Sequence, residues 1–239
     1  MAEAAFWGLV TGGSLWIGAA LAAWARLSER VIGLAMAFGA GALIAAVAYE
    51  LVIDAFASDL RLASLGFACG GLTFYVGDVV IDRMGGEGRK SMTGEAQLAG
   101  SASAIVLGTV LDGIPESFVL GSSLVDEGTV PVAVVVGVFV SNVPEALSGT
   151  AGLLSAGWHH ARVFKMWSAV VVASIAATVA GWLLIDNLGN TGGAFVTAFA
   201  AGALLVMLAD TLIPEAFVLG GREAGLVTAL GFAVGFALS

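Results

Sequence analysis

Long apolar runs constrain the fold of this chain more than any other feature. A helix needs about 20 mostly apolar residues to cross the hydrocarbon core of a bilayer. Eight such runs follow one another, at residues 5–27, 31–55, 60–82, 98–124, 129–155, 164–187, 192–217 and 221–239. Because they occupy most of the chain, the sequence predicts an all-α integral membrane protein with eight transmembrane helices in one domain, 1–239.

The composition agrees with this class and argues against a nucleic-acid partner. Of the 239 residues, 59% are hydrophobic and 11% are charged, against about 25% charged in soluble domains. The net charge is −9, but about half of the acidic residues fall inside the apolar runs. The chain contains a single cysteine, which excludes an intrachain disulfide.

The positive charges predict the orientation of the helices. The loops after the first, third, fifth and seventh runs hold eight basic residues, and the opposite loops hold only Arg61. Short cytoplasmic loops carry an excess of Lys and Arg. We therefore expect a multi-pass protein of the cell membrane with both termini outside and loop 83–97 in the cytoplasm. The eight residues are Arg26, Arg30, Arg83, Arg89, Lys90, Arg162, Lys165 and Arg222.

Two stretches of the chain resemble each other although they are predicted to cross in opposite directions. The segments 37–56 and 198–217 are identical at 10 of 20 positions without a gap. Similar segments of opposite direction are typical of inverted-topology repeats, which bind their substrate near the membrane midplane. The sequence thus predicts a 3+2+3 arrangement: a first three-helix repeat at 1–82, a central pair at 98–155 and an inverted repeat at 164–239.

Acidic residues inside the central pair are the strongest functional signal. Asp112 and Glu116 lie in the fourth run, four residues apart and therefore on one helix face. Ser141, Asn142 and Glu145 lie in the fifth run. Each central charge costs roughly 2.5–3.5 kcal/mol on insertion scales, and no Lys or Arg lies at a comparable depth. A cation or protons must therefore neutralise these acids.

Helix-breaking residues accompany the acids. Pro115 and Pro144 each precede a glutamate, Gly113 follows Asp112, and Pro214 precedes Glu215 in the seventh run. Proline removes the hydrogen bond to the carbonyl four residues earlier, and a freed carbonyl in the membrane is tolerated where it lines a cavity. Carboxylate, amide, hydroxyl and carbonyl oxygens together are ligands for hard or borderline divalent cations.

Further acids suggest a route to this site. Glu50 and Asp54 lie towards the outer end of the second run, whereas Asp210 and Glu215 lie towards the inner end of the seventh. Acids at both mouths and at the centre predict a staged path for a cation.

At these residues the chain resembles the ZIP family of divalent-metal transporters. The matching stretches are DGIPE at 112–116, SNVPE at 141–145 and DTLIPEA at 210–216. The resemblance implies eight spans, external termini and a variable cytoplasmic loop after the third span. It also implies a first metal site on Asp112, Glu116, Ser141 and Glu145, and a neighbouring second site on Gly113 and Asn142 with both glutamates shared.

The chain departs from the family pattern at three places. Asp112 stands where histidine is common, Gly113 stands where asparagine is common, and the sixth run has no acid where some members have a glutamate. The second site therefore lacks the ligands that other members have at Gly113 and in the sixth run. Without imidazole, an oxygen-only set suits manganese, magnesium or calcium better than zinc, although zinc, iron and cadmium are also candidates.

These observations predict a transporter that moves a divalent metal towards the cytoplasm, with the metal as substrate and no prosthetic group. No ATP-binding G-x-x-x-x-G-K-[ST] motif is present. One alternative is a proton- or anion-linked carrier that uses the same acids without metal. An intramembrane metalloenzyme is a weaker alternative because the chain has no H-E-x-x-H motif. The expected partners are a divalent metal ion and the lipid bilayer; the 34 glycines permit close helix packing within a monomer or in a homodimer.

Overall fold

The computed structural model of this chain describes residues 1–24, 27–86, 102–126 and 130–239. About 95% of the described residues are helical, and none of them lies in a strand. Six helical segments among them are long and apolar enough to cross a membrane. The prediction of an all-α protein with several helices long and apolar enough to cross a membrane is therefore confirmed, whereas the count of eight spans stays a prediction.

The helices follow the predicted apolar runs closely. The first half contains α1 (Ala2–Trp24), α2 (Glu29–Ala46), the π-helical turn η1 (Val47–Val52), α3 (Ile53–Ser58), α4 (Leu60–Ile81), the π-helical turn η2 (Asp82–Gly86) and α6 (Ala102–Asp126). The second half contains α7 (Val132–Ser155), α8 (His160–Met207), the π-helical turn η3 (Leu208–Leu212), α9 (Ile213–Gly220), the 3-10 turn η4 (Gly221–Glu223) and α10 (Ala224–Leu238).

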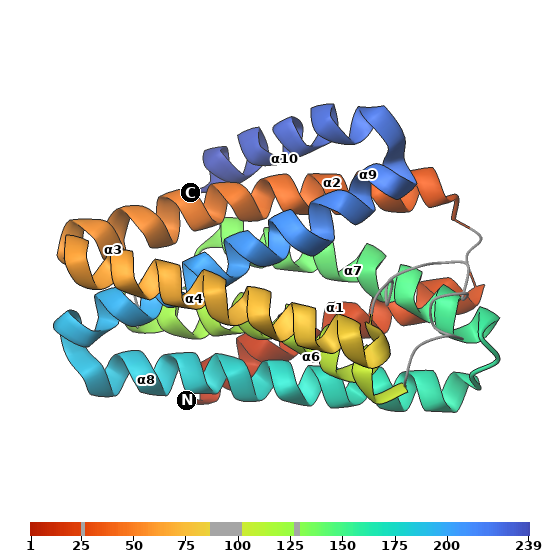
Figure 1. The fold of residues 1–239 in the computed structure, drawn as a ribbon, viewed down its shortest axis with the longest axis horizontal. Helices are drawn as coiled ribbons and strands as arrows, with labels where there is room; N and C mark the ends of the chain where they lie inside the picture. The colour runs from red at the N-terminus through yellow and green to blue at the C-terminus, as the bar shows by residue number, and fades with distance from the viewer. Residues whose placement is uncertain (25–26, 87–101, 127–129) are drawn as a thin grey trace.

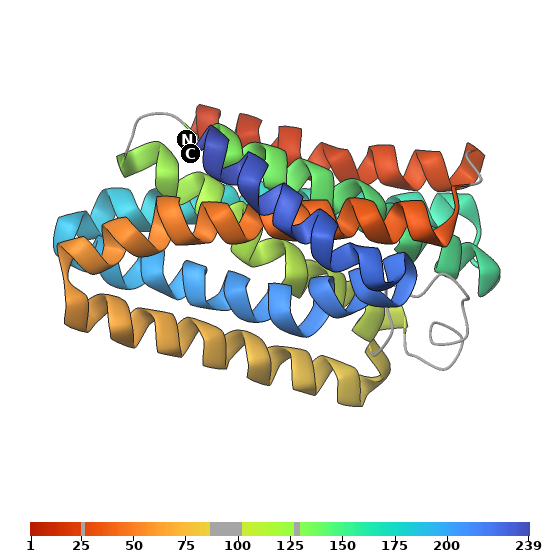
Figure 2. The same cartoon turned by 90° about the horizontal axis from the view of Figure 1, so that it is seen from above.

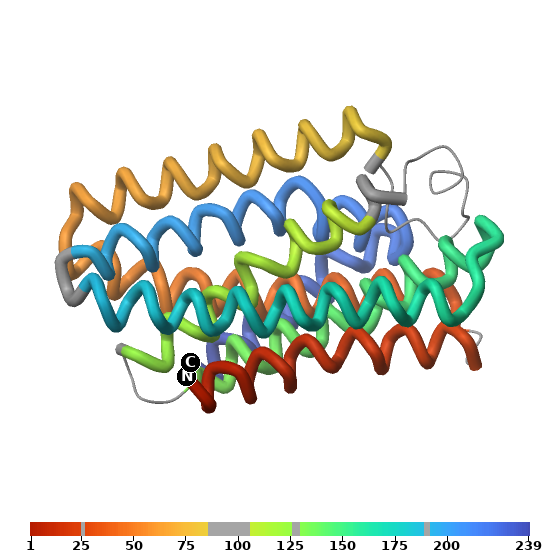
Figure 3. The backbone as a smooth tube through the Cα atoms, turned by 90° about the horizontal axis from the view of Figure 1, so that it is seen from below, coloured from red at the N-terminus to blue at the C-terminus, as the bar shows by residue number. Residues whose placement is uncertain are grey.

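The long helix α8 consists of two arms that run antiparallel to each other (Figures 1 and 3). The arms belong to separate candidate spans, His160–Leu188 and Gly192–Leu238. The second of these turns back once more at Gly221, whose φ of 69° lies in the region that glycine adopts without steric cost. The predicted runs at 164–187, 192–217 and 221–239 thus correspond to three successive rods.

The helices pack in two groups. The first arm of α8 lies with α1, α6 and α7, while α2 packs on α10 and α4 packs on the second arm of α8 (Figures 1 and 2). The contact between α2 and α7 joins the groups. Large buried side chains fill the centre, among them Leu43, Leu120 and Leu204. Leu72, Val218 and Leu226 are instead more than 60% exposed, as expected for residues that face lipid.

The ends of the bundle differ in charge. The start of α2, the end of α4, the turn between α7 and α8 and the turn between α9 and α10 all lie at one end (Figures 1 and 2). The described basic residues at that end are Arg30, Arg83, Arg162, Lys165 and Arg222, whereas Arg61 lies in the first turn of α4 at the other end. Arg26, Arg89, Lys90 and most of the predicted loop 83–97 fall outside the described residues.

The two similar segments share local structure. The π-helical turns η1 and η3 begin at Val47 and Leu208, which are aligned positions of the segments 37–56 and 198–217. Two close helix crossings match as well. Gly41 abuts the carbonyl of Thr228 on α10, and its aligned partner Gly202 abuts the carbonyl of Phe67 on α4. A methyl group would not fit at either glycine, so the backbones are in direct contact.

The expectation that proline breaks the central helices is wrong for α6 and α7. Pro115 lies inside α6 and Pro144 lies inside α7, and both helices continue past them. Proline cannot donate to the carbonyl four residues earlier, so each helix continues with one backbone hydrogen bond fewer at its proline. Pro214 lies in the first turn of α9, directly after the π-helical turn η3, so the irregular backbone there precedes the proline.

Candidate functional site

A small cavity lies between α1, α6, α7 and α8, and two of the predicted acids line it. Glu116 of α6 and Glu145 of α7 are 3% and 6% exposed, and Asn142 of α7 lies beside them. The cavity has a volume of about 10 Å³, which is room for about one water molecule. The other lining residues are Leu15, Thr109, Gly113, Ser117, Val170 and Ser174.

The helical period explains which residues of α6 face this cavity. At about 100° per residue, Thr109, Gly113, Glu116 and Ser117 fall within about a quarter turn of one another. Asp112 lies at the edge of this face, on the side away from Gly113 and Ser117. It is buried, at 2% exposed, yet it does not line the cavity.

Ser141 of α7 contacts Glu116 of α6 outside the lining of the cavity. Its Oγ lies 3.4 Å from Glu116 Oε1 and donates to the carbonyl oxygen of Val138 at 3.0 Å. Gly39 of α2 packs against the backbone of Ser141 so closely that a methyl group there would overlap it. Ser141 is therefore fixed at a three-helix contact, within reach of the glutamate but outside the cavity lining.

Asn142 is held by α1. Its Nδ2 donates to the carbonyl oxygen of Thr11 at 3.1 Å, and the bond is buried. The hydroxyl of Ser14 donates to the same carbonyl. Because a carbonyl can only accept, the amide nitrogen of Asn142 must face α1, and its Oδ1 is the amide atom left for the cavity. Gly18 supports this contact, since α1 lies against the carbonyl of Val143 there.

The donors at the cavity are oxygen atoms. Two carboxylates, one amide oxygen and the hydroxyls of Thr109, Ser117 and Ser174 line it, and no Lys, Arg, His or Cys does so among the described residues. The described residues contain no group of three or more His, Cys, Asp or Glu side chains placed to hold a metal ion. The chemistry available here is thus a pair of carboxylates supplemented by neutral oxygen donors.

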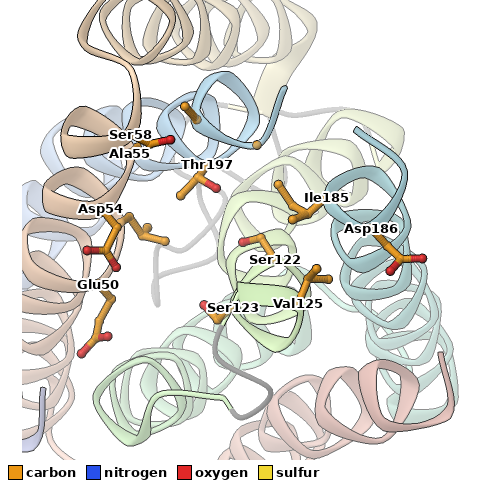
Figure 4. Close-up of a pocket in the computed structure, with 13 residues that line it drawn as sticks. Glu50, Asp54, Ala55, Ser58, Ser122, Ser123, Val125, Ile185, Asp186 and Thr197 are labelled. Carbon is orange, nitrogen blue, oxygen red and sulfur yellow. The ribbon is translucent and has the colours of Figure 1, made fainter. Parts of the chain in front are cut away.

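A much larger cavity opens at the end of the bundle where α3 and the turn of α8 lie. We call it the vestibule; its volume is about 370 Å³. Glu50 and Asp54 lie on one wall and Asp186 on the opposite wall, with Ser122 and Ser123 of α6 between them (Figure 4). The acids are at least partly exposed, whereas both serines are buried. Figure 4 shows the carboxylate of Asp186 pointing away from the serines, so the acidic side chains lie at the rim and the two hydroxyls lie deeper.

An apolar layer separates the vestibule from the small cavity. Ser122 lies about 9 Å further along α6 than Glu116, at about 1.5 Å per residue. Between them, Val119 and Leu120 are 1% and 0% exposed, and both belong to the main hydrophobic core. Two buried apolar side chains of α6 thus lie between the level of the vestibule and the level of the small cavity.

The two remaining predicted path residues do not join either cavity. Asp210 lies in η3 and is exposed, and Glu215 lies in α9 and is half-buried. Asp54 and Glu215 are aligned positions of the two similar segments, but only Asp54 lines the vestibule.

Sequence reasoning missed four important residues. Thr109 and Ser117 share the face of Glu116, so the helical period alone could have found them. Ser174 is a polar residue in the middle of an apolar helix, which is a weaker signal. Asp186 lies near the end of the first arm of α8 and was overlooked among the acids of the apolar runs.

A scan of the chain against protein-family models found no match, and a comparison with curated proteins found none either.

Proposed function

We propose that this chain is a ZIP-like transporter that moves a divalent metal cation of the zinc, manganese or iron class across the cell membrane towards the cytoplasm. The observation that carries the proposal is the convergence of Glu116 and Glu145 on one buried cavity without a basic lining residue. Buried carboxylates are costly unless a positive charge or a proton neutralises them. A dehydrated divalent ion supplies that charge and matches the size of the cavity.

The vestibule supports a direction for this transport. It lies at the end of the bundle opposite the basic turns, which under the positive-inside rule is the extracytoplasmic end. Its acidic rim attracts cations, and the apolar layer at Val119 and Leu120 closes it from the central cavity. In this arrangement the protein accepts a cation from outside before the central site is reached.

The matched π-helical turns and glycine crossings support the proposed inverted repeat. Helix α2 packs on α10 in the same way as the second arm of α8 packs on α4. The two contacts lie at aligned positions of the similar segments. We propose eight spans in a 3+2+3 arrangement with both termini outside. The central site then lies between the two repeats, where inverted-repeat transporters bind their substrates.

The experiment is metal uptake into vesicles that contain the purified protein and a trapped metal indicator. Glu116→Gln and Glu145→Gln keep the side-chain size and remove the charge, so both should abolish uptake. Glu29→Gln, an exposed acid at the start of α2, is the matched control and should transport normally. Near-normal uptake by both central variants, at equal protein content, would refute the proposal.

A proton-linked carrier is the second candidate, because the described residues contain no three-acid group placed for a metal. Under that reading the glutamates exchange protons and bind no metal. Calorimetric titration of the purified protein with manganese, zinc, iron and cadmium separates the two functions. No binding heat with any of the four metals, combined with proton uptake that depends on Glu116, would favour the carrier.

A further inference from the structure

Ser174 brings an oxygen donor to the central cavity from a third helix. It lies on the first arm of α8, is 5% exposed and lines the cavity together with Glu116 and Glu145. The predicted site includes residues of α6 and α7 only. Hydroxyls of Thr109 and Ser117, which are 6% and 4% exposed, extend the same lining on α6.

Ser174 packs beside glycines of two neighbouring helices, Gly113 of α6 and Gly12 of α1. A Cβ at Gly113 would lie 3.6 Å from Ser174 Oγ, and a Cβ at Gly12 would lie 3.3 Å from Ser174 Cβ. The hydroxyl of Ser174 therefore lies at ordinary contact distance from the Cβ position of Gly113. Helix α8 supplies an oxygen donor next to a position where α6 supplies none.

The size of the cavity limits its occupancy. About 10 Å³ holds about one water-sized particle, and a second ion would need further ligands that the lining does not provide. The site therefore takes one ion that has shed most of its water.

We propose that Ser174 completes an all-oxygen site for one hard divalent cation of the manganese class, and that this residue sets the metal preference. The inference rests on the proposed function. Carboxylate, amide and hydroxyl oxygens suit manganese and magnesium, whereas imidazole and thiolate ligands favour zinc and cadmium. Asn142 contributes its oxygen because its nitrogen is bound to Thr11, and no described lining residue offers sulfur or imidazole nitrogen.

The test changes one atom at position 174. Ser174→Ala removes the donor and keeps the Cβ, so manganese affinity should fall several-fold with little effect on folding. Ser174→Cys replaces oxygen by sulfur, for which Gly113 leaves space, and should raise the ratio of cadmium to manganese affinity at least tenfold. With cobalt it should also give thiolate-to-metal charge-transfer absorption. Ser168→Cys on the same helix, outside the cavity lining, is the control and should give neither change.

The outcomes separate the inference from the function on which it rests. If both Ser174 variants keep the wild-type affinities and ratio while Glu116→Gln loses binding, Ser174 is not a ligand and transport of a metal stands. If Glu116→Gln also binds normally, or the wild type binds none of these cations, both are overturned. A cobalt thiolate band in Ser174→Cys alone, with the predicted shift in preference, would establish the assignment.

Discussion

Asn142 on α7 donates its side-chain hydrogen bond to the backbone carbonyl of Thr11 on α1, at 3.1 Å and out of contact with solvent. Asn142→Ala should therefore lower the free energy of unfolding in detergent by about 1 kcal/mol, the usual worth of a hydrogen bond between membrane helices. It should also weaken metal uptake, because the amide oxygen leaves the cavity.

Asn187 offers a matched control for that substitution. Its Nδ2 donates to the carbonyl of Leu183 at 2.6 Å, within its own helix and on an exposed surface. Asn187→Ala should change neither thermal stability nor uptake appreciably. Equal effects of the two alanine variants would contradict the role given to the bond between α7 and α1.

Glycine at the crossing of α2 and α10 should resist substitution. Gly41 faces the carbonyl of Thr228 without space for a methyl group, whereas Gly13 on α1 has no neighbour within 4 Å of its Cβ position. Gly41→Ala should destabilise the protein by about 1–3 kcal/mol, as overpacking does. Gly13→Ala should be neutral or slightly stabilising, since alanine favours the helix. Thermal unfolding of both variants checks this, and a tolerated Gly41→Ala would show that the crossing is looser than described.

The acidic rim of the vestibule should speed cation capture by electrostatic attraction. The triple variant Glu50→Gln/Asp54→Asn/Asp186→Asn should lower kcat/KM for uptake several-fold at low ionic strength and leave kcat nearly unchanged. The difference from wild type should shrink as salt is added, because charges at the rim are screened. Glu3→Gln, an exposed acid on α1, is the control. A salt-independent loss would point to a structural effect instead.

The apolar layer should divide α6 into an accessible and a protected part. In a Cys69→Ser background, Ser123→Cys on the vestibule floor should react with a membrane-impermeant thiol reagent added outside, and Ser117→Cys below Leu120 should react far more slowly. Labelling of sealed vesicles of known orientation measures both rates. Equal rates at the two positions would show that Val119 and Leu120 do not close the path.

The helices of this fold could be predicted from sequence because each one is a continuous apolar run, which is a local feature of the chain. Each predicted apolar run overlaps a described helix, and the internal similarity pointed to segments whose π-helical turns coincide. The effect of Pro115 and Pro144 on their helices was harder to predict. Whether proline ends a helix depends on the neighbours that hold it in line, and those neighbours are distant in sequence.

The candidate site was predictable only in part, for the same reason. Glu116 and Glu145 followed from their depth and their proline partners, and they line one cavity. Asp112 lies just outside the face of α6 that lines the cavity. The difference is a rotation of tens of degrees about the helix axis, which the sequence alone does not determine. Ser174 joins the cavity through the packing of α8 against α1 and α6, and no local pattern in that apolar helix signals this.

Anomalous X-ray diffraction from crystals soaked in manganese tests the central claim most directly, because it locates the ion itself. The account predicts one strong anomalous peak between α6 and α7, within about 2.0–2.6 Å of oxygen atoms of Glu116 and Glu145, and no such peak in Glu116→Gln crystals. A protein that takes up manganese but shows its peak elsewhere, or an empty cavity at saturating metal, would contradict it.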